Sequence, residues 1–196
     1  MNKDEITKVF KDIPPLETER LILRRMQKTD ADDMYDYARR QDTTRYLTWN
    51  PHPDRKFSYQ YLVYINTQYR AGGFYDWAVV HRDSGRMIGT CGFTRFDFGN
   101  EAAEIGYVIN PDFWGRGYAT EAVRRVIRFG FDYLSLHRIE AKFMEGNDAS
   151  RRVMEKCGMI FEGTRRESLL IKGDFVSVGV CAIIRTEYNR SRVGLK

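Results

Sequence analysis

Two glycines within the run Pro111 to Ala122 form the part of the sequence best suited to chemistry. The run reads PDFWGRGYATEA, and Gly115 and Gly117 lie where a strand pattern gives way to a long amphipathic helix pattern. Glycine lets successive backbone N–H groups turn toward one point, because no Cβ stands in the way. The helix that follows adds unpaired first-turn donors and the positive end of its dipole. The loop therefore predicts an anion site, with a phosphate or pyrophosphate as the anion.

A second polar element begins at Asn147 and ends near Gly158. It reads NDASRRVMEKCG and directly follows a strand pattern. Asn147 suits a helix cap or a ligand contact, and Ser150 lies one turn into the helix at the same end. A Gly-x-Gly spacing alone also occurs in plain strand-to-helix turns, so this second element strengthens the functional interpretation of the first.

Composition limits the class of protein. The 196 residues suit one domain, and 42% apolar with 30% charged residues are typical of a globular chain. The three cysteines (Cys91, Cys157 and Cys181) form no C-x-x-C pair, which argues against zinc and favours reduced thiols in the cytoplasm. We expect no metal site, and no membrane span because no apolar run approaches about 20 residues. The net charge of +5 gives weak support for nucleic-acid binding.

Strands and helices must position the two polar segments. Apolar alternation predicts strands over residues 21–23, 77–81, 86–93, 102–109, 138–143, 159–171 and 175–184. Longer periodicity and capping residues predict helices over 29–40, 57–70, 119–134 and 148–156. This order differs from the regular alternation of a doubly wound parallel sheet, so we expect a mixed α/β (α+β) fold in one domain.

These segments resemble the GNAT N-acetyltransferase superfamily, and in particular its RimJ/RimL-like branch. Branch members show A-E-I-G-Y, then P-x-x-W-G-x-G-Y-A-T-E-A, then N-x-x-S-x-x-V-x-E-K-x-G-F. This chain has AEIGY at 103–107, PDFWGRGYATEA at 111–122 and NDASRRVMEKCGM at 147–159. The resemblance covers roughly residues 16–188. It implies a single GNAT domain, with a mixed, mostly antiparallel central sheet of about seven strands flanked by four helices.

The resemblance also implies how acetyl-CoA is held. Amides of the glycine loop and the Thr120 hydroxyl would face the CoA pyrophosphate. The pantetheine arm would pair like an added strand with the strand end at Val108 and Ile109. Asn147 and Ser150 would touch the pantetheine or the sulfur. The expected cofactor-binding residues are Tyr107, Val108, Ile109, Trp114, Gly115, Arg116, Gly117, Tyr118, Ala119, Thr120, Asn147 and Ser150.

Catalysis then needs little more than delivery of a neutral amine in line with an activated thioester. An α-amino group, with a pKa of about 8, needs only a modest base, whereas a lysine at about 10.4 needs more help. Glu104 is the first candidate for the base, because it lies on the strand that carries the thioester, and Glu167 is the second. Ser150 is the candidate acid that protonates the departing thiolate. Other GNAT branches use a tyrosine where this chain has Met154.

Each catalytic candidate also has a purely structural alternative. Glu104 would then pair with a basic residue across the sheet, Glu167 would pair locally with Arg165 or Arg166, and Ser150 would be only a first-turn helix residue. The residue types are compatible with both alternatives.

The expected activity is direct acetyl transfer from acetyl-CoA to a primary amine, with a protein or peptide α-amino group of the ribosomal-protein type as the acceptor. Residues 42–75 and 165–175 are expected to frame the acceptor site. The alternatives are a small-amine acetyltransferase (polyamine, amino acid or antibiotic) and a non-catalytic acyl-CoA-binding module. We expect a cytoplasmic monomer or homodimer without direct nucleic-acid or membrane binding. Its divisions would be an arm over 1–15, the domain over 16–188 and a basic tail over 189–196.

Overall fold

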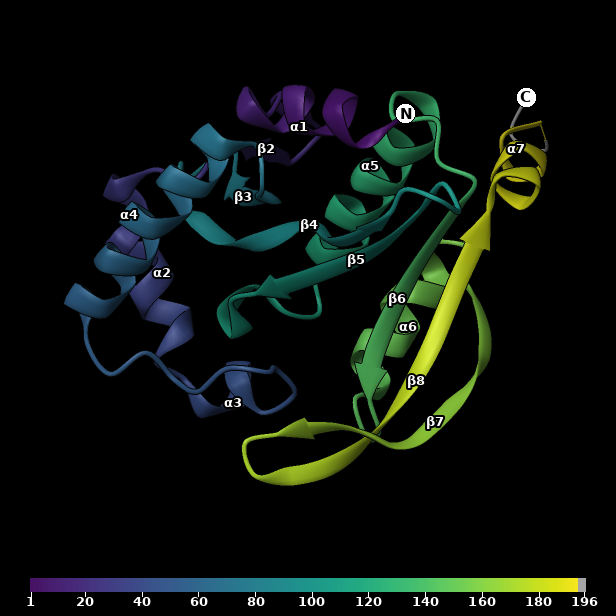
Figure 1. Cartoon of the computed structure of the whole chain (residues 1–196). Helices are drawn as coiled ribbons and strands as arrows, with labels where there is room; N and C mark the ends of the chain where they lie inside the picture. Colours follow the sequence, from purple (N-terminus) through teal and green to yellow (C-terminus); the bar gives the residue numbers. More distant parts are fainter. Residues whose placement is uncertain (194–196) are drawn as a thin grey trace.

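The computed structural model describes residues 1–193 and places one mixed sheet at the centre of the molecule (Figure 1). Within these residues the sheet has eight strands in the order β1-β2-β3-β4-β5-β6-β8-β7. Neighbouring strands are antiparallel except β5 and β6, which are parallel. The strands are β1 (Leu16–Glu17), β2 (Leu21–Arg24), β3 (Tyr75–His81), β4 (Met87–Asp97), β5 (Ala102–Ile109), β6 (Arg138–Met144), β7 (Ile160–Ile171) and β8 (Asp174–Ile184).

Helices pack on this sheet and against one another. The long helix α5 packs on β4 and β5, α6 packs on β6, β7 and β8, and α2 and α4 pack together beside the β2–β4 half. The α-helices are α1 (Lys3–Lys11), α2 (Ala31–Ala38), α3 (Gln41–Thr44), α4 (Arg55–Ala71), α5 (Tyr118–Asp132), α6 (Asp148–Lys156) and α7 (Arg185–Val193). Two 3-10 turns, η1 (Lys28–Asp30) and η2 (Pro111–Phe113), precede α2 and α5. None of the described helices combines the length and apolar character needed to cross a bilayer.

The predicted fold class is confirmed, with more elements than the apolar patterns indicated. The two residues of β1 and the four of α3 are too short to show periodicity. Helix α1 lies within residues 1–15, where an arm was expected. An Asn2–Glu5 capping box begins it, and it buries Ile6 and Phe10. The expected tail, residues 189–196, lies partly outside the described residues.

Aromatic side chains form much of the core beneath α5. Trp77 of β3 and Phe93 of β4 both contact the ring of Phe10, which ties α1 to the sheet. Trp77 also meets Phe129 of α5 with ring centroids 5.5 Å apart. At Gly130 an added Cβ would lie 2.7 Å from Ile139 Cδ1, so glycine lets α5 approach β6 closely.

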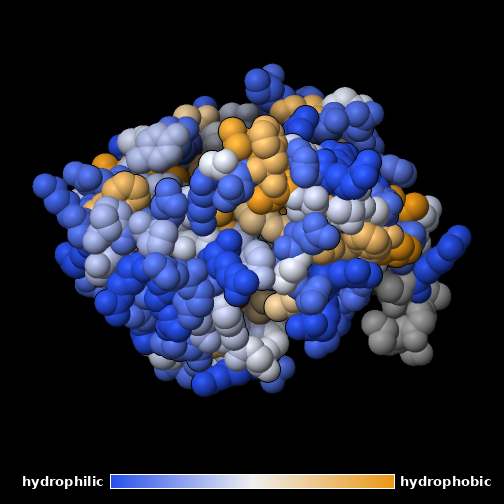
Figure 2. All heavy atoms as spheres, turned by 90° about the horizontal axis from the view of Figure 1, so that it is seen from below, coloured by the Kyte–Doolittle hydropathy of each residue, from blue (hydrophilic) through white to orange (hydrophobic). Residues whose placement is uncertain are grey.

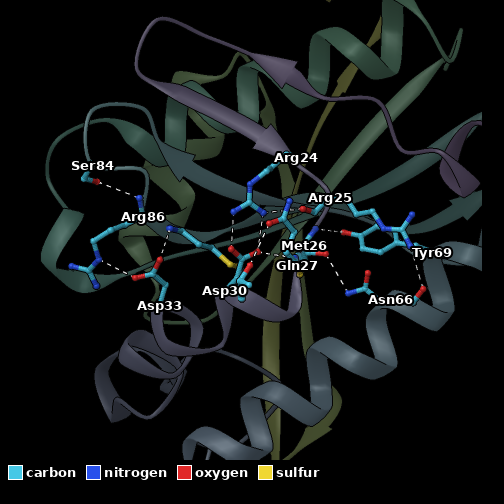
Figure 3. A network of polar contacts seen from close by, with 12 residues as sticks. Arg24, Arg25, Met26, Gln27, Asp30, Asp33, Asn66, Tyr69, Ser84 and Arg86 are labelled. Carbon is cyan, nitrogen blue, oxygen red and sulfur yellow. Dashed lines mark hydrogen bonds and ion pairs between the residues drawn. The ribbon is translucent and has the colours of Figure 1, made fainter.

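A polar network fixes α2 and α4 against the sheet (Figure 3). The Arg24 guanidinium at the end of β2 donates two hydrogen bonds to the carboxylate of Asp30, which is 5% exposed. Asn66 of α4 donates to the Met26 carbonyl at 3.2 Å. Arg86 and the Met87 amide both donate to Asp33 of α2. Because two parallel hydrogen bonds join Arg24 to Asp30, they fix the orientation of the segment between these residues, which leads into α2.

The parallel strands β5 and β6 separate halfway along their length, as Figure 1 shows. They pair from Ala102 with Arg138 to Ile105 with Ala141. Beyond that point β5 continues beside β4 as far as Ile109, while β6 continues beside β8. From Gly106 onward, the edge of β5 that faced β6 therefore has no neighbouring strand among the described residues, although it lies in the middle of the sheet.

Candidate active site

A cavity of about 200 Å³ opens where β5 and β6 separate, and we call it the central cavity. Strands β5 and β6 contribute Glu104, Ile105, Gly106, Tyr107 and Lys142–Met144 to its lining, and α6 and its cap contribute Asn147 and Ser150. The loop after α3 and the β7–β8 hairpin contribute Tyr46, Leu47, Thr48, Leu169, Ile171 and Val178, and β4 contributes Thr94. A larger hollow beneath α1, lined by residues such as Glu5 and Tyr133, contains none of the predicted site residues.

The glycine loop adopts the conformation that an anion cradle needs. Gly115 and Gly117 have left-handed φ angles of 73° and 83°, and both are exposed. An added Cβ would meet nothing within 4 Å at Gly115, so backbone angle rather than crowding selects glycine there. Any other residue would cost about 1–2 kcal/mol at such an angle. Because α5 begins at Tyr118, the amides of Tyr118, Ala119 and Thr120 are first-turn donors without intrahelical acceptors, and the Glu121 amide is the first to bond within the helix, to the Gly117 carbonyl.

Arg20 braces this loop, a contact that the motifs did not reveal. Its Nη1 donates to the Arg116 carbonyl at 3.0 Å, and its guanidinium forms an ion pair with Glu121 in the first turn of α5. The guanidinium also lies over the Tyr118 ring, 4.5 Å from the centroid. Arg20 therefore holds the loop in place, with its charge paired to that of Glu121.

The free edge of β5 leads from the loop into the central cavity. Residues 106–109 pair with β4 on one side, whereas pairing with β6 ends at Ile105. The Trp114 indole N–H donates to the Ile109 carbonyl at 2.6 Å, which caps the end of this edge. Val108 and the residues before it thus keep a strand edge to which an extended chain can add.

Asn147, Ser150 and Tyr107 form a linked polar group at one wall of the cavity. The Asn147 Oδ1 accepts from the Ser150 amide at 3.1 Å, which caps α6. The Tyr107 hydroxyl lies 2.9 Å from the Ser150 Oγ and 2.9 Å from its carbonyl oxygen. Burial raises the pKa of Tyr107 well above its usual value, so its hydroxyl remains protonated at physiological pH. The pair can pass a proton between its oxygens.

Glu104 lies in the same cavity and forms an ion pair with Lys142 Nζ across the β5–β6 junction. Both side chains are about one-fifth exposed, at 21% and 22%. Lys142 Nζ also lies 3.7 Å from Glu140. The cross-sheet pairing considered for Glu104 is thus present, and it does not remove Glu104 from the cavity. Its role as a base stays a prediction.

Glu167 is not brought to the central cavity. It has a left-handed φ of 46° and sits where the β7–β8 register breaks, between Arg165 and Leu169. Its amide donates to Ser177 Oγ at 3.1 Å. Of the three catalytic candidates, the structure therefore gathers Glu104 and Ser150 around one cavity and leaves Glu167 outside it.

The β7–β8 hairpin tip, residues 165–175, borders the cavity together with the loop after α3. Lys172 Nζ donates to the Thr44 carbonyl at 2.6 Å and ties the tip to the end of α3. Leu170 and Phe175 are cross-strand partners and are 64% and 67% exposed. Figure 2, which views the molecule from the end where this hairpin lies, shows apolar residues gathered among hydrophilic ones.

Comparison with known proteins identifies the family to which this arrangement belongs. Residues 20–160 match the family model described as the acetyltransferase (GNAT) domain. The chain belongs to the GNAT family. Its predicted enzyme class, N-acetyltransferase, is thereby confirmed. The central cavity and the glycine loop lie largely within the matched residues.

Individual relatives support the same family. N-acetyltransferase p20 of Bacillus licheniformis, itself uncharacterized, is 34% identical over 173 residues, which span 88% of this chain and 97% of that protein. The ribosomal protein uS5-alanine N-acetyltransferase of Escherichia coli is 27% identical over 184 residues, or 90% of this chain and 94% of that enzyme. A GNAT-family acetyltransferase structure from Bacillus anthracis superimposes with a TM-score of 0.77 at 26% identity, covering 87% of this chain and 98% of that chain.

Proposed function

We propose that this GNAT enzyme is a protein N-terminal acetyltransferase of the RimJ/RimL-like type, which transfers the acetyl group of acetyl-CoA directly to an α-amino group. The observation that carries the proposal is the central cavity. Its lining includes Gly106 and Tyr107 of the free strand edge, which leads toward the glycine loop, as well as the Glu104 carboxylate and Leu169 of the apolar hairpin. A donor and an acceptor can thus meet within one opening in the sheet.

The donor side fits acetyl-CoA through its backbone. The left-handed glycines and the first turn of α5 would hold the pyrophosphate, and the free edge of β5 would hold the pantetheine arm. Both places would bind with main-chain atoms, because the Gly115 and Gly117 positions leave the loop open to close approach. An amide on the β5 edge would polarise the thioester carbonyl.

The catalytic steps need only residues that line the cavity. Glu104 would take a proton from the acceptor ammonium, either directly or through one water. The neutral amine then attacks the carbonyl carbon, the C–N bond forms and the C–S bond breaks. The thiolate would receive a proton from the Ser150–Tyr107 hydroxyl pair, whose oxygens lie 2.9 Å apart, and the second proton of the amine nitrogen would return to that pair.

The hairpin tip favours a polypeptide over a small amine as acceptor. Leu169 lines the cavity and is itself 41% exposed, and its chain neighbour Leu170 and the cross-strand partner Phe175 are exposed outside the cavity. A polyamine or aminoglycoside is highly charged and strongly hydrated and gains little from such side chains, whereas the residues after a peptide N-terminus can bury them. The uS5-alanine N-acetyltransferase relative is consistent with this acceptor class.

A panel of acceptors tests the proposal through the release of free CoA thiol. It would contain peptides with a free α-amine, the same peptides blocked at the N-terminus but carrying lysine, and polyamines, amino acids and aminoglycosides. We expect turnover with the free α-amine peptides and at least tenfold lower kcat/KM with the blocked ones. Turnover confined to small amines would replace the proposal with the small-amine alternative. Acetyl-CoA binding with no turnover on the whole panel would favour a non-catalytic module.

A further inference from the structure

Lys142 places a primary amine inside the cavity proposed for acetyl transfer. Its Nζ contacts the Glu104 carboxylate, and its side chain lines the same cavity as Tyr107 and Ser150. The side chain is only 22% exposed. The amine therefore lies beside the proposed base, where the amine of an acceptor would also have to lie.

The separation of β5 and β6 explains why Lys142 reaches this place. Glu104 and Glu140 are partners in the paired part of the two strands, and pairing ends with Ala141. Lys142 is the next residue and points to the same face of β6 as Glu140, because strand side chains alternate. Its flexible side chain therefore crosses the start of the opening, where both Glu104 and Glu140 attract its charge.

We propose that Lys142 is a self-acetylation site, which takes the acetyl group when acetyl-CoA is bound and no acceptor occupies the cavity. This inference rests on the proposed function of the same cavity. The inference adds a modification site on the protein itself. The Lys142 amine would then compete with every acceptor amine for the same acetyl group.

The reaction balances without a further reactant. Glu104 takes one proton from the Lys142 ammonium, and the neutral Nζ attacks the thioester carbonyl carbon. The C–N bond forms, the C–S bond breaks with its electron pair going to sulfur, and the second nitrogen proton ends on the CoA thiolate. The products are Nε-acetyl-Lys142, CoA thiol and one proton, which Glu104 releases to solvent. Nothing is oxidised or reduced.

Acetylation changes the cavity in two ways. It removes the positive charge that pairs with Glu104, and it adds an acetyl group to an opening of about 200 Å³. The modified enzyme should therefore have a lower kcat/KM for acceptors. Conversely, an acceptor ammonium that pairs with Glu104 displaces Lys142 and protects it.

The proposal is tested by incubating the enzyme with isotope-labelled acetyl-CoA. The protein is then digested with a protease that cleaves after acidic residues, and the peptides are analysed by tandem mass spectrometry. Lys172, which is exposed at the hairpin tip, is the matched control for chemical acetylation. We expect label at Lys142 to appear at least tenfold faster than at Lys172, at a rate per molecule independent of enzyme concentration. Label at Lys142 should fall to the Lys172 level in Glu104→Gln and with a saturating peptide acceptor.

Labelling of Lys142 no faster than Lys172, or undiminished in Glu104→Gln, would overturn the inference. A parallel thiol-release assay with peptides separates the two proposals. If peptides are acetylated while Lys142 stays unlabelled, only self-acetylation fails. If neither peptide nor Lys142 is acetylated, the proposed function fails as well.

Discussion

Arg20 and Glu121 hold the two ends of the glycine loop together, although 101 residues separate them in the chain. Glu121 accepts from the Arg20 backbone amide at 2.9 Å and from its Nε at 2.7 Å. Partial burial opposes ionisation, but hydrogen bonds from Thr18 and Arg20 lower the pKa of Glu121 overall. The contacts of Arg20, just before β2, therefore fix the orientation of the glycine loop and of its backbone amides.

Substitution of Gly115 should weaken the binding of acetyl-CoA. In Gly115→Trp the indole would occupy the open space above the loop and strain its left-handed backbone, so Kd measured by calorimetry should rise at least tenfold. Gly85→Trp is the matched control, because Gly85 has a φ of 66°, has nothing within 4 Å of an added Cβ, and lies in a different turn. Equal affinities in the two variants would contradict the loop assignment.

Loss of the Glu104 carboxylate should slow catalysis most near neutral pH. In Glu104→Gln we expect kcat/KM to fall about 100-fold at pH 7, because a positioned base contributes a factor of this order. The defect should shrink above pH 8, where a free α-amine deprotonates without help. Glu140→Gln is the control, since Glu140 also faces Lys142 but does not line the cavity. A flat ratio of rates across pH would remove Glu104 as the base.

The hydroxyl pair of Ser150 and Tyr107 should act on the leaving thiolate. Ser150→Ala is expected to lower kcat about tenfold and to leave the KM for acetyl-CoA within threefold. Tyr107→Phe should have a smaller effect, because it removes the second hydroxyl and keeps Ser150 in place. If a donor with a more acidic leaving thiol slows equally in Ser150→Ala, proton delivery to sulfur is not the function of this serine.

The apolar hairpin tip should matter for peptide acceptors only. Leu170→Ser removes an exposed apolar side chain beside the cavity, so KM for peptides should rise about threefold to tenfold, while acetyl-CoA affinity stays constant. Ile160→Ser is the control: this residue is 56% exposed and lies at the opposite end of β7. An equal rise in KM for both variants would argue against a docking role of the tip.

Asp76 should make the protein less stable as pH rises. Burial raises its pKa to about 7, and hydrogen bonds from Thr90 and the Trp77 amide oppose this only in part. Between about pH 4 and 7 the folded protein therefore keeps a proton that the unfolded chain has lost, so the free energy of unfolding falls across this window. Asp76→Asn should be more stable than the parent at pH 8, by up to about 4 kcal/mol, and equal near pH 4. Urea unfolding at both pH values checks this, and a pH-independent difference would contradict it.

Local patterns were sufficient to predict the glycine loop and the helix that follows it. Gly115 and Gly117 permit a left-handed backbone between a strand and a helix, and the apolar face of α5 is long enough to show its helical periodicity. Helix α1 also had a local signal, since Asn2 and Glu5 have the spacing of a capping box before Ile6. That signal was outweighed by the charged residues around it.

Contacts between distant segments could not be predicted in the same way. The Glu104–Lys142 pair depends on the parallel register that sets Glu104 beside Glu140, and nothing local to either residue specifies that register. The tie between Lys172 and Thr44 depends likewise on how far the hairpin reaches past the sheet. Glu167 is a candidate by its place in a motif, but it lies at a register break in β7 and does not line the cavity.

The separation of β5 and β6 has a kinetic consequence. The cavity lining includes Ile105 and Tyr107 from one face of β5 and Glu104 and Gly106 from the other, so the opening passes through the sheet. We expect the two substrates to enter it from opposite faces, so that neither blocks the departure of the other. Initial-rate plots against both substrates should then show intersecting lines, with CoA and the acetylated product released in either order.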